Sequence, residues 1–167
     1  MSFRIGFGYD AHAFEAGRTL VLGGVVIHFD RGLAGHSDAD VLTHAIADAI
    51  LGALAEGDLG RHFPPGDPAW KDASSLVLLE MVMQRARRRG AAVVNVDTTL
   101  ILEAPKIAPH APAMKAALAP ILGVGTERVS IKATTNEGLD AVGRGEGALA
   151  HAVVLLQLED CPCAVPC

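Results

Sequence analysis

The chain has 167 residues, of which half are hydrophobic and a fifth are charged, a profile typical of one ordinary folded domain and not of a disordered chain. Its formal net charge of −5 argues against a nucleic-acid-binding surface, which needs a basic stripe. The N-terminal residues lack a basic segment followed by an apolar run, and no stretch reaches about 18 apolar residues. We therefore expect neither a signal peptide nor a membrane span, and a cytoplasmic location.

All three cysteines, Cys161, Cys163 and Cys167, lie in the last seven residues. The body of the chain therefore has no disulfide framework. The spacing in "CPCAVPC" matches no standard zinc pattern, although binding of a soft metal stays an alternative. We expect residues 1–158 to form a single domain and residues 159–167 to be a disordered Cys/Pro tail, because chain ends are commonly disordered.

Runs rich in β-branched and aliphatic residues predict strands, and apolar residues at helical spacing predict three helices. In chain order these are strands at residues 3–9, 19–22 and 25–29, helices at 38–56 and 74–89, a strand at 92–103, a helix at 111–122, and strands at 128–134 and 148–158.

Several residues mark where these helices begin and end. Ser37 followed three residues later by Asp40 resembles a capping box at the start of the first helix, which Gly57 ends. Gly90 ends the second helix, and Pro120 predicts a bend or an early end in the third.

Strands interleaved with three helices predict an α+β single-domain sandwich, in which helices cover one face of a mixed, mainly four-stranded sheet. The strands at 92–103 and 148–158 are almost continuously apolar, so we expect both of their faces to be buried. Three helices leave one sheet face open. We expect a subunit interface to cover it.

The stretch "RIGFGYDAHAF" predicts the first candidate site. Asp10 and His12 are alternate residues of a strand, so their side chains share one face. His44, at the edge of the apolar stripe of the first helix, completes a set of two histidines and one carboxylate. This set fits a catalytic zinc with an open position, and it equally fits non-haem iron. Asp48, one turn after His44, is interpreted as the partner that holds its imidazole.

A plainer interpretation stays open for the same residues. His12 would be a loop residue, and His44 a core histidine that bonds to Asp48.

Six segments, in order from residue 4 to about residue 157, carry a family resemblance: "GYDAHAF", "GHSDADVLTHA", "GDLGRHFPP", "NVDTTLILEAPKIAP", "KATTNEGL" and "GRGEG". Together they closely resemble the 2-C-methyl-D-erythritol 2,4-cyclodiphosphate synthases, lyases of the non-mevalonate (MEP) route to isoprenoids. The resemblance implies a homotrimer with active sites between subunits. It also implies conversion of 4-diphosphocytidyl-2-C-methyl-D-erythritol 2-phosphate to the cyclic diphosphate, with release of CMP.

The resemblance also implies the roles of individual residues. It places one Zn²⁺ per subunit on Asp10, His12 and His44, and an Mg²⁺ or Mn²⁺ on Glu137. It implies catalytic roles for His36 and Thr135. The residues that it implies for substrate binding are Ser37, Asp58, Gly60, Phe63, Pro64, Pro65, Gly66, Asp67, Leu102, Glu103, Ala104, Pro105, Lys106, Ile107, Ala108, Thr134, Asn136, Ala141 and Arg144.

In the family, residues corresponding to Arg144 and Glu146 line a cavity on the trimer axis that holds an isoprenoid diphosphate; a surface ion pair is the alternative. The sequence departs from the family here. A third threonine is replaced by Asn136, and a lysine and an aromatic residue by Gly138 and Ala141. We therefore expect the axial cavity to differ in shape.

Two other functions fit the same residues. One is a metal-dependent phosphoesterase, with Asp48 or His36 as the general base that activates water. The other is a non-catalytic module that binds isoprenoid diphosphate or nucleotide.

Overall fold

The computed structural model describes residues 1–159, so the three cysteines and nearly all of the expected tail lie outside the described residues. The described elements are β1 (Ser2–Ala16), β2 (Leu20–Leu22), β3 (Val25–Ile27), β4 (Arg31–Leu33), α1 (Val41–Ala53), α2 (Leu59–His62), η1 (Pro68–Trp70), α3 (Ser75–Arg88), β5 (Ala91–Ile101), α4 (Ala111–Leu122), η2 (Thr126–Arg128), β6 (Val129–Thr134), α5 (Asp140–Gly143) and β7 (Gly147–Leu158).

The main sheet is mixed and has five strands in the order β4-β1-β7-β5-β6. β1 pairs antiparallel with β4 and β7, β7 pairs antiparallel with β5, and β5 pairs parallel with β6. The predicted strand count of four was too low because it missed β4, three residues that pair with the far end of β1. β2 and β3 form a separate hairpin.

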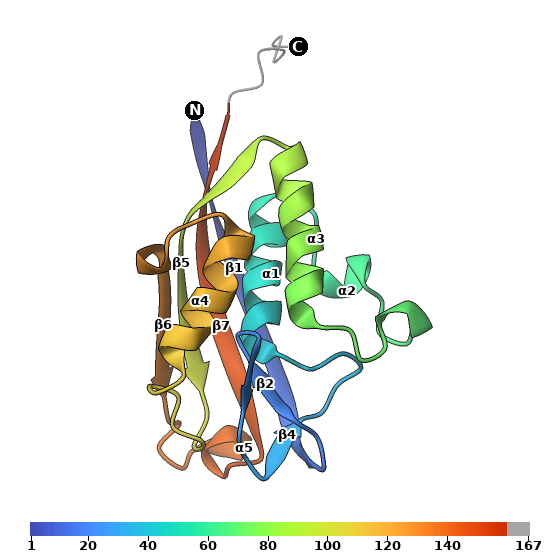
Figure 1. Ribbon diagram of the computed structural model, residues 1–167, viewed down its shortest axis with the longest axis vertical. Coiled ribbons are helices and arrows are strands. Elements are labelled where there is room, and N and C mark those ends of the chain that lie inside the picture. The colour runs from blue at the N-terminus through green and yellow to red at the C-terminus, as the bar shows by residue number, and fades with distance from the viewer. Residues whose placement is uncertain (160–167) are drawn as a thin grey trace.

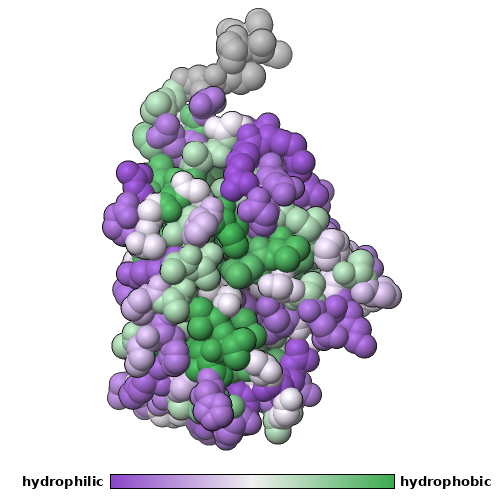
Figure 2. All heavy atoms as spheres, in the orientation of Figure 1, coloured by the Kyte–Doolittle hydropathy of each residue, from purple (hydrophilic) through white to green (hydrophobic). Residues whose placement is uncertain are grey.

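Three helices, α1, α3 and α4, cover one face of this sheet (Figure 1). α1 contacts β1, β7 and α3, which explains why ten of its thirteen residues are buried and its apolar side chains run almost all the way round. α3 is amphipathic, and Figure 2 shows hydrophilic side chains gathered over its last turn, which carries Arg85, Arg87 and Arg88. α1 is therefore the central element of the core.

The backbones of β1 and α1 are in direct contact because Gly6 and Gly8 face the helix. A Cβ atom on Gly6 would lie 1.7 Å from the carbonyl oxygen of Ala49, and one on Gly8 would lie 1.9 Å from that of Ala45. Real Cβ atoms do not approach other atoms so closely. Only glycine allows this close approach of strand and helix, which brings the residues of α1 within reach of those on β1.

α1 begins at Val41 and ends at Ala53, so the predicted range of 38–56 was too long. Its N-cap is Asp40, and the predicted capping by Ser37 was wrong. The buried carboxylate of Asp40 accepts hydrogen bonds from the backbone N–H and the hydroxyl of Thr43 at 3.1 and 2.7 Å. It also accepts the N–H groups of Gly23 and Gly24 at 2.9 and 2.7 Å, and so ties the β2–β3 turn to the start of the helix.

The other two predicted helices are confirmed. α3 ends just before Gly90, and α4 continues through Pro120 to Leu122 and ends at Gly123, which has a φ of 72°. The first strand is longer than predicted, because β7 pairs with it as far as Ala13 and β4 extends it further. Asp10 and His12 therefore lie within a strand and not at its end.

The sheet face opposite the helices is open in the described chain. The outward side chains of β1, Phe3, Ile5, Phe7 and Tyr9, are between 51% and 74% exposed, and Val153 on β7 is 42% exposed. Within one chain, β5 and β7 thus bury only the face toward the helices, contrary to the expectation for both faces. No helix within residues 1–159 combines the length and the apolar character that crossing a bilayer requires.

The contact between Gly8 and α1 predicts a mutational effect. Gly8→Ala should lower the free energy of unfolding by about 3 kcal/mol, the upper end of the usual cost of overpacking, because the new methyl group overlaps a backbone carbonyl that cannot move without shifting α1. Gly52→Ala is the matched control, since a Cβ there meets only the carbonyl oxygen of Phe7 at 3.8 Å; it should be neutral or stabilising by up to about 1 kcal/mol. Urea unfolding of both variants tests this, and equal stabilities would refute the close-contact argument.

Candidate metal centre

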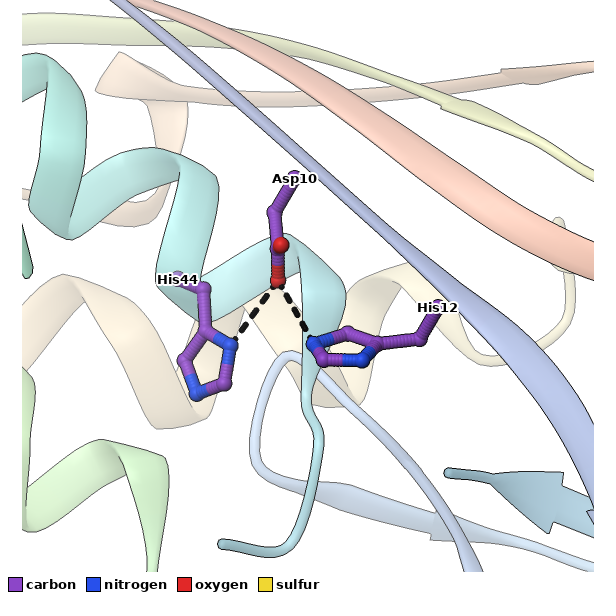
Figure 3. Close-up of side chains that lie close together, drawn as sticks. All are labelled: Asp10, His12 and His44. Carbon is purple, nitrogen blue, oxygen red and sulfur yellow. Dashed lines mark hydrogen bonds and ion pairs between the residues drawn. The ribbon is translucent and has the colours of Figure 1, made fainter. Parts of the chain in front are cut away.

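Two neighbouring elements bring three ligand side chains to one point (Figure 3). β1 presents Asp10 and His12 on the face toward the helices, and the first turn of α1 presents His44. Oδ2 of Asp10 lies 2.9 Å from Nδ1 of His44 and 3.0 Å from Nε2 of His12. One ligand atom from each residue lies within 4.8 Å of the others. The predicted grouping of these three residues is confirmed.

The geometry of the group fits a metal ion. Nε2 of His12 is buried and makes no hydrogen bond of good geometry among the described residues, and its charged neighbour is Oδ2 of Asp10 at 3.0 Å. A buried polar atom without a well-formed hydrogen bond is rare in proteins and calls for an explanation such as an ion. Two imidazoles and a carboxylate are donors that hold zinc with an open position, and also non-haem iron. The group can therefore hold a divalent transition metal.

The plainer interpretation of these histidines is wrong in two respects. His12 lies inside β1 and not in a loop. Nδ1 of His44 faces Asp10, while Oδ1 of Asp48 accepts the backbone N–H of Leu59 at 2.6 Å. Asp48 thus anchors the start of α2. The nitrogens of the His44 imidazole contact Asp10, Ser37 and Ser75 instead.

Charges within the group perturb its titration. Burial alone would raise the pKa of Asp10, but hydrogen bonds and charge from His12 and His44 outweigh burial and hold this pKa well below its ordinary value. Burial would lower the pKa of His44, but the Asp10 carboxylate outweighs it and raises this pKa. Burial raises the pKa of Asp48, and the nearby carboxylate of Asp58 raises it further. The hydrogen bond from the backbone N–H of Leu59 lowers this pKa, but by less. Asp10 therefore stays anionic, as a metal ligand must.

A cavity of about 470 Å³ opens at the metal group. It brings together many residues that the resemblance implies for the site, and it adds Leu59, Trp70 and Leu78. The expected residues that line it are Asp10, His12, His36, Ser37, His44, Asp48, Asp58, Gly60, Phe63 and Pro65.

The loop that follows Phe63 borders this cavity. Nε2 of His36 lies 3.1 Å from the carbonyl oxygen of Asp67, whose carboxylate caps η1. The edge of the Trp70 ring meets the Phe63 ring at 5.0 Å between centroids. Pro64 and Gly66 belong to the same loop but do not line the cavity.

A second, smaller hollow of about 70 Å³ lies at the other edge of the sheet. Its lining brings together two segments that are far apart in the sequence, the loop after β5 and the end of β6. The lining residues are Leu102, Glu103, Pro105, Lys106, Ile107, Ala133, Thr134 and Thr135. Ala104 and Ala108 are not among them. The backbone N–H of Asn136 donates to Oε1 of Glu103 at 2.9 Å and joins the two segments.

The remaining candidates lie outside both hollows. Glu137 accepts a hydrogen bond from the Thr135 hydroxyl at 2.7 Å. Arg144 and Glu146 form an exposed ion pair at 2.6 Å, as the surface-pair alternative expects for a single chain. Ala141 lies in α5, next to this pair.

Sequence reasoning missed two residues beside the metal group: Ser75, which contacts His44, and Asp38, which contacts Ser75. Oγ of Ser75 lies 2.8 Å from Nε2 of His44, and the Ser75 hydroxyl donates to the Asp38 carboxylate. Ser75 starts a different helix, 31 residues further along the chain. No sequence spacing signals this contact, because it arises only when α3 packs against α1.

The raised pKa of His44 predicts how metal affinity depends on pH. A raised pKa keeps the proton on the imidazole to higher pH, so the metal competes with a proton for Nδ1. Zinc affinity should fall about tenfold per pH unit once His44 is protonated. Zinc titrations between pH 8 and pH 6 test this. His44→Ala should abolish tight binding, whereas His28→Ala, at an exposed histidine outside the group, should leave it unchanged. Tight binding by His44→Ala would refute the ligand assignment.

Comparisons with known proteins agree with the geometry. A sequence model of the YgbB family matches residues 3–157. The 2-C-methyl-D-erythritol 2,4-cyclodiphosphate synthase of Gloeobacter violaceus is 58% identical over 154 residues, which cover 92% of this chain and 94% of that protein.

Two solved structures share the fold. A 2C-methyl-D-erythritol-2,4-cyclodiphosphate synthase in a CDP-bound form is 38% identical with a TM-score of 0.85, covering 92% of this chain and all of that one. The bifunctional IspDF of Campylobacter jejuni is 38% identical with a TM-score of 0.91; the match covers 95% of this chain and 43% of that longer one. The matching profile, the relative of nearly equal length and the shared fold together show that the chain belongs to the YgbB family, the family of the 2-C-methyl-D-erythritol 2,4-cyclodiphosphate synthases.

Proposed function

We propose that the chain is a lyase of the non-mevalonate isoprenoid pathway that closes 2-C-methyl-D-erythritol 2,4-cyclodiphosphate. Its substrate is 4-diphosphocytidyl-2-C-methyl-D-erythritol 2-phosphate, and the other product is CMP. The observation that carries the proposal is the intact Asp10–His12–His44 group, which opens onto a cavity lined by His36, Ser37 and Asp58. Family membership supports the same reaction.

The reaction is an attack of one anion on another, so charge repulsion is its first obstacle. The 2-phosphate oxygen bonds to the β-phosphorus, and the bond from that phosphorus to the oxygen of CMP breaks. Phosphoryl transfer depends mainly on positioning and charge neutralisation. Zinc held by Asp10, His12 and His44 would act as a Lewis acid toward the β-phosphate when bound. The rest of the site has to hold the flexible substrate so that its two ends meet.

The residues of the large cavity suit this positioning. We assign His36 and Ser37, which lie beside the metal group, to the reacting phosphates. We assign Asp58 and Gly60 to the hydroxyl groups of the methylerythritol unit. Asp58 is also the N-cap of α2, where its carboxylate accepts the N–H of Arg61 at 2.9 Å. This bond fixes the carboxylate at the cavity wall.

We assign the smaller hollow to the cytidine and its diphosphate. Leu102–Ala108 would hold the base, while Thr134, Thr135 and Asn136 would contact the phosphates. Glu137 would help to bind Mg²⁺ or Mn²⁺, because a carboxylate is the ligand type that these hard cations prefer. A hydroxyl such as that of Thr135 would stabilise developing charge, and its loss should cost about 2.7–4 kcal/mol of activation free energy.

The distance between the two hollows supports an active site shared between subunits. The metal group lies on β1 and the smaller hollow at the end of β6, three strands away in the sheet order. Three strand spacings amount to roughly 14 Å. A second copy of the chain would supply the nucleotide hollow next to the metal group, and the resemblance implies a homotrimer. The exposed apolar strip on β1 supports such assembly, because large exposed apolar patches mark interfaces.

Three further predictions remain. We keep the cytoplasmic location and the single catalytic domain of residues 1–158. We also keep an axial cavity between the Arg144–Glu146 pairs of three subunits as a site for isoprenoid diphosphate. Residue 138 is a glycine where the family often has a lysine, and a Cβ there would meet nothing within 4 Å, so no other described residue fills the space. Isoprenoid binding is therefore the weaker of these predictions.

A product assay tests the proposed reaction. Purified protein is incubated with 4-diphosphocytidyl-2-C-methyl-D-erythritol 2-phosphate and magnesium, with and without a zinc chelator, and followed by phosphorus NMR. CMP should appear together with the two coupled signals of the cyclic diphosphate, and both should be lost on chelation. CMP with only open-chain phosphates would instead show a phosphoesterase. If the substrate stayed unchanged with both metals present, the protein would be a non-catalytic binding module.

Assembly can be tested on the open sheet face. Ile5→Lys places a charge on the apolar strip and should shift the protein from trimer to monomer in light scattering. It should reduce turnover strongly while leaving zinc binding intact. Val77→Lys, at an exposed apolar side chain on the helix-covered side, is the control and should stay trimeric. A wild-type chain that is monomeric and fully active would exclude the shared site.

A further inference from the structure

We infer that Ser75 and Asp38 are positioning residues, which together fix the imidazole of His44 with its Nδ1 lone pair aimed at the metal. The inference rests on the proposed metal centre and adds two residues that touch neither substrate nor metal. The imidazole of His44 has a second nitrogen, which faces away from Asp10. That atom, Nε2, lies 2.8 Å from Oγ of Ser75.

Hydrogen counting sets the direction of this contact. A serine hydroxyl has one proton to donate. Oδ1 of Asp38 takes that proton, and Oδ2 of Asp38 accepts the backbone N–H of Ser75 at 2.9 Å. A carboxylate can only accept, so the Ser75 hydroxyl is turned toward Asp38 and presents a lone pair to His44. Nε2 of His44 must then carry a proton. Nδ1 faces the acceptor Oδ2 of Asp10 at 2.9 Å, so a bound metal takes the place of the proton shared there and receives the Nδ1 lone pair, while Nε2 keeps its proton.

The Nδ1 atom lies where a metal ligand is required. Nδ1 of His44 is the atom next to Oδ2 of Asp10, the oxygen that also faces Nε2 of His12. Metal-bound histidines commonly donate their other N–H to a fixed acceptor, which sets the tautomer and the ring orientation. Here the acceptor is Oγ of Ser75, which the Asp38 carboxylate holds in place through a second hydrogen bond.

The surroundings make the arrangement rigid. Ser75 is 1% exposed, and it is the first residue of α3, so its backbone is fixed by the helix and by Asp38. Ser37 is a weaker candidate for the same role. Its Oγ lies 3.3 Å from Nε2 of His44 and already accepts the N–H of Ala39. Ser75 is closer, and its hydroxyl is oriented by a carboxylate.

Adjacent serines give a matched pair of variants. Ser75→Ala removes the acceptor for Nε2. Ser74→Ala removes the neighbouring hydroxyl, which is exposed and makes no capping hydrogen bond. Ser75→Thr keeps a hydroxyl at the buried position. All are made in the full chain, and circular dichroism with urea unfolding checks that each folds.

The measurement is the zinc dissociation constant of the metal-free protein, in competition with a chromophoric chelator and without substrate. Ser75→Ala should weaken zinc binding by about 10- to 100-fold, the usual cost of losing an outer hydrogen-bond partner of a metal ligand. Ser74→Ala should stay within about twofold of wild type, and Ser75→Thr should recover most of the affinity. The visible spectrum of the Co²⁺-loaded protein should change in Ser75→Ala alone, because the imidazole ligand is no longer held in one orientation.

A double variant tests whether Asp38 acts on His44 through Ser75. Asp38→Asn should also weaken zinc binding, and Asp38→Asn combined with Ser75→Ala should weaken it no more than Ser75→Ala alone, since coupled residues are not additive. If the losses of zinc affinity in the two single variants instead added up in the double variant, Asp38 would not act through Ser75.

Three other results would overturn the inference. Equal zinc binding by Ser75→Ala and Ser74→Ala would remove the role of the hydroxyl, and so would zinc binding by Ser75→Thr that is as weak as that of Ser75→Ala. A wild-type chain that binds no zinc would overturn the metal assignment itself, and the inference with it. Zinc binding without cyclisation would leave the inference standing and refute only the proposed reaction.

Discussion

The direct contact between the backbones of β1 and α1 is the constraint on which the rest of the structure depends. Gly6 and Gly8 leave no side chain between strand and helix, and Ala45 and Ala49 present carbonyl groups to them. This contact sets the depth of α1 in the core and so the distance from His44 to β1. A wider spacing would separate the metal ligands, and the same glycines thereby serve packing and the site. Asp40 secures the entrance of the helix from the other side, through four hydrogen bonds.

The electrostatics of the metal group suit a reaction between anions. Asp10 stays ionised because two imidazoles surround it. When both histidines are neutral, the Asp10 carboxylate is the one charge of the group. A divalent cation held there leaves this three-residue group with a net positive charge, at the cavity where phosphate oxygens have to gather. The protein thus concentrates its compensation of substrate charge in one place, although its own net charge is −5. Local charge, and not the charge of the whole chain, decides which ligands such a site accepts.

The open face of the sheet and the separated hollows point to the same solution. An exposed strip of Phe3, Ile5, Phe7 and Tyr9 is unfavourable in water. Covering it with further copies would remove that cost and would also bring the nucleotide hollow of one copy to the metal group of another. Burial of apolar surface and completion of the active site would then be one event.

The sequence by itself determined most of the elements and the ligand set. Residue alternation placed Asp10 and His12 on one face, and helical spacing placed His44 on the inner edge of α1, because strand and helix periods are local properties of the chain. Family motifs added the cavity residues. The sequence did not determine the N-cap Asp40, the edge strand β4, the glycine contact, or the link from Asp38 through Ser75 to His44. Each of these joins segments far apart in the chain, and only the packing of α1 between β1 and α3 decides which of them meet.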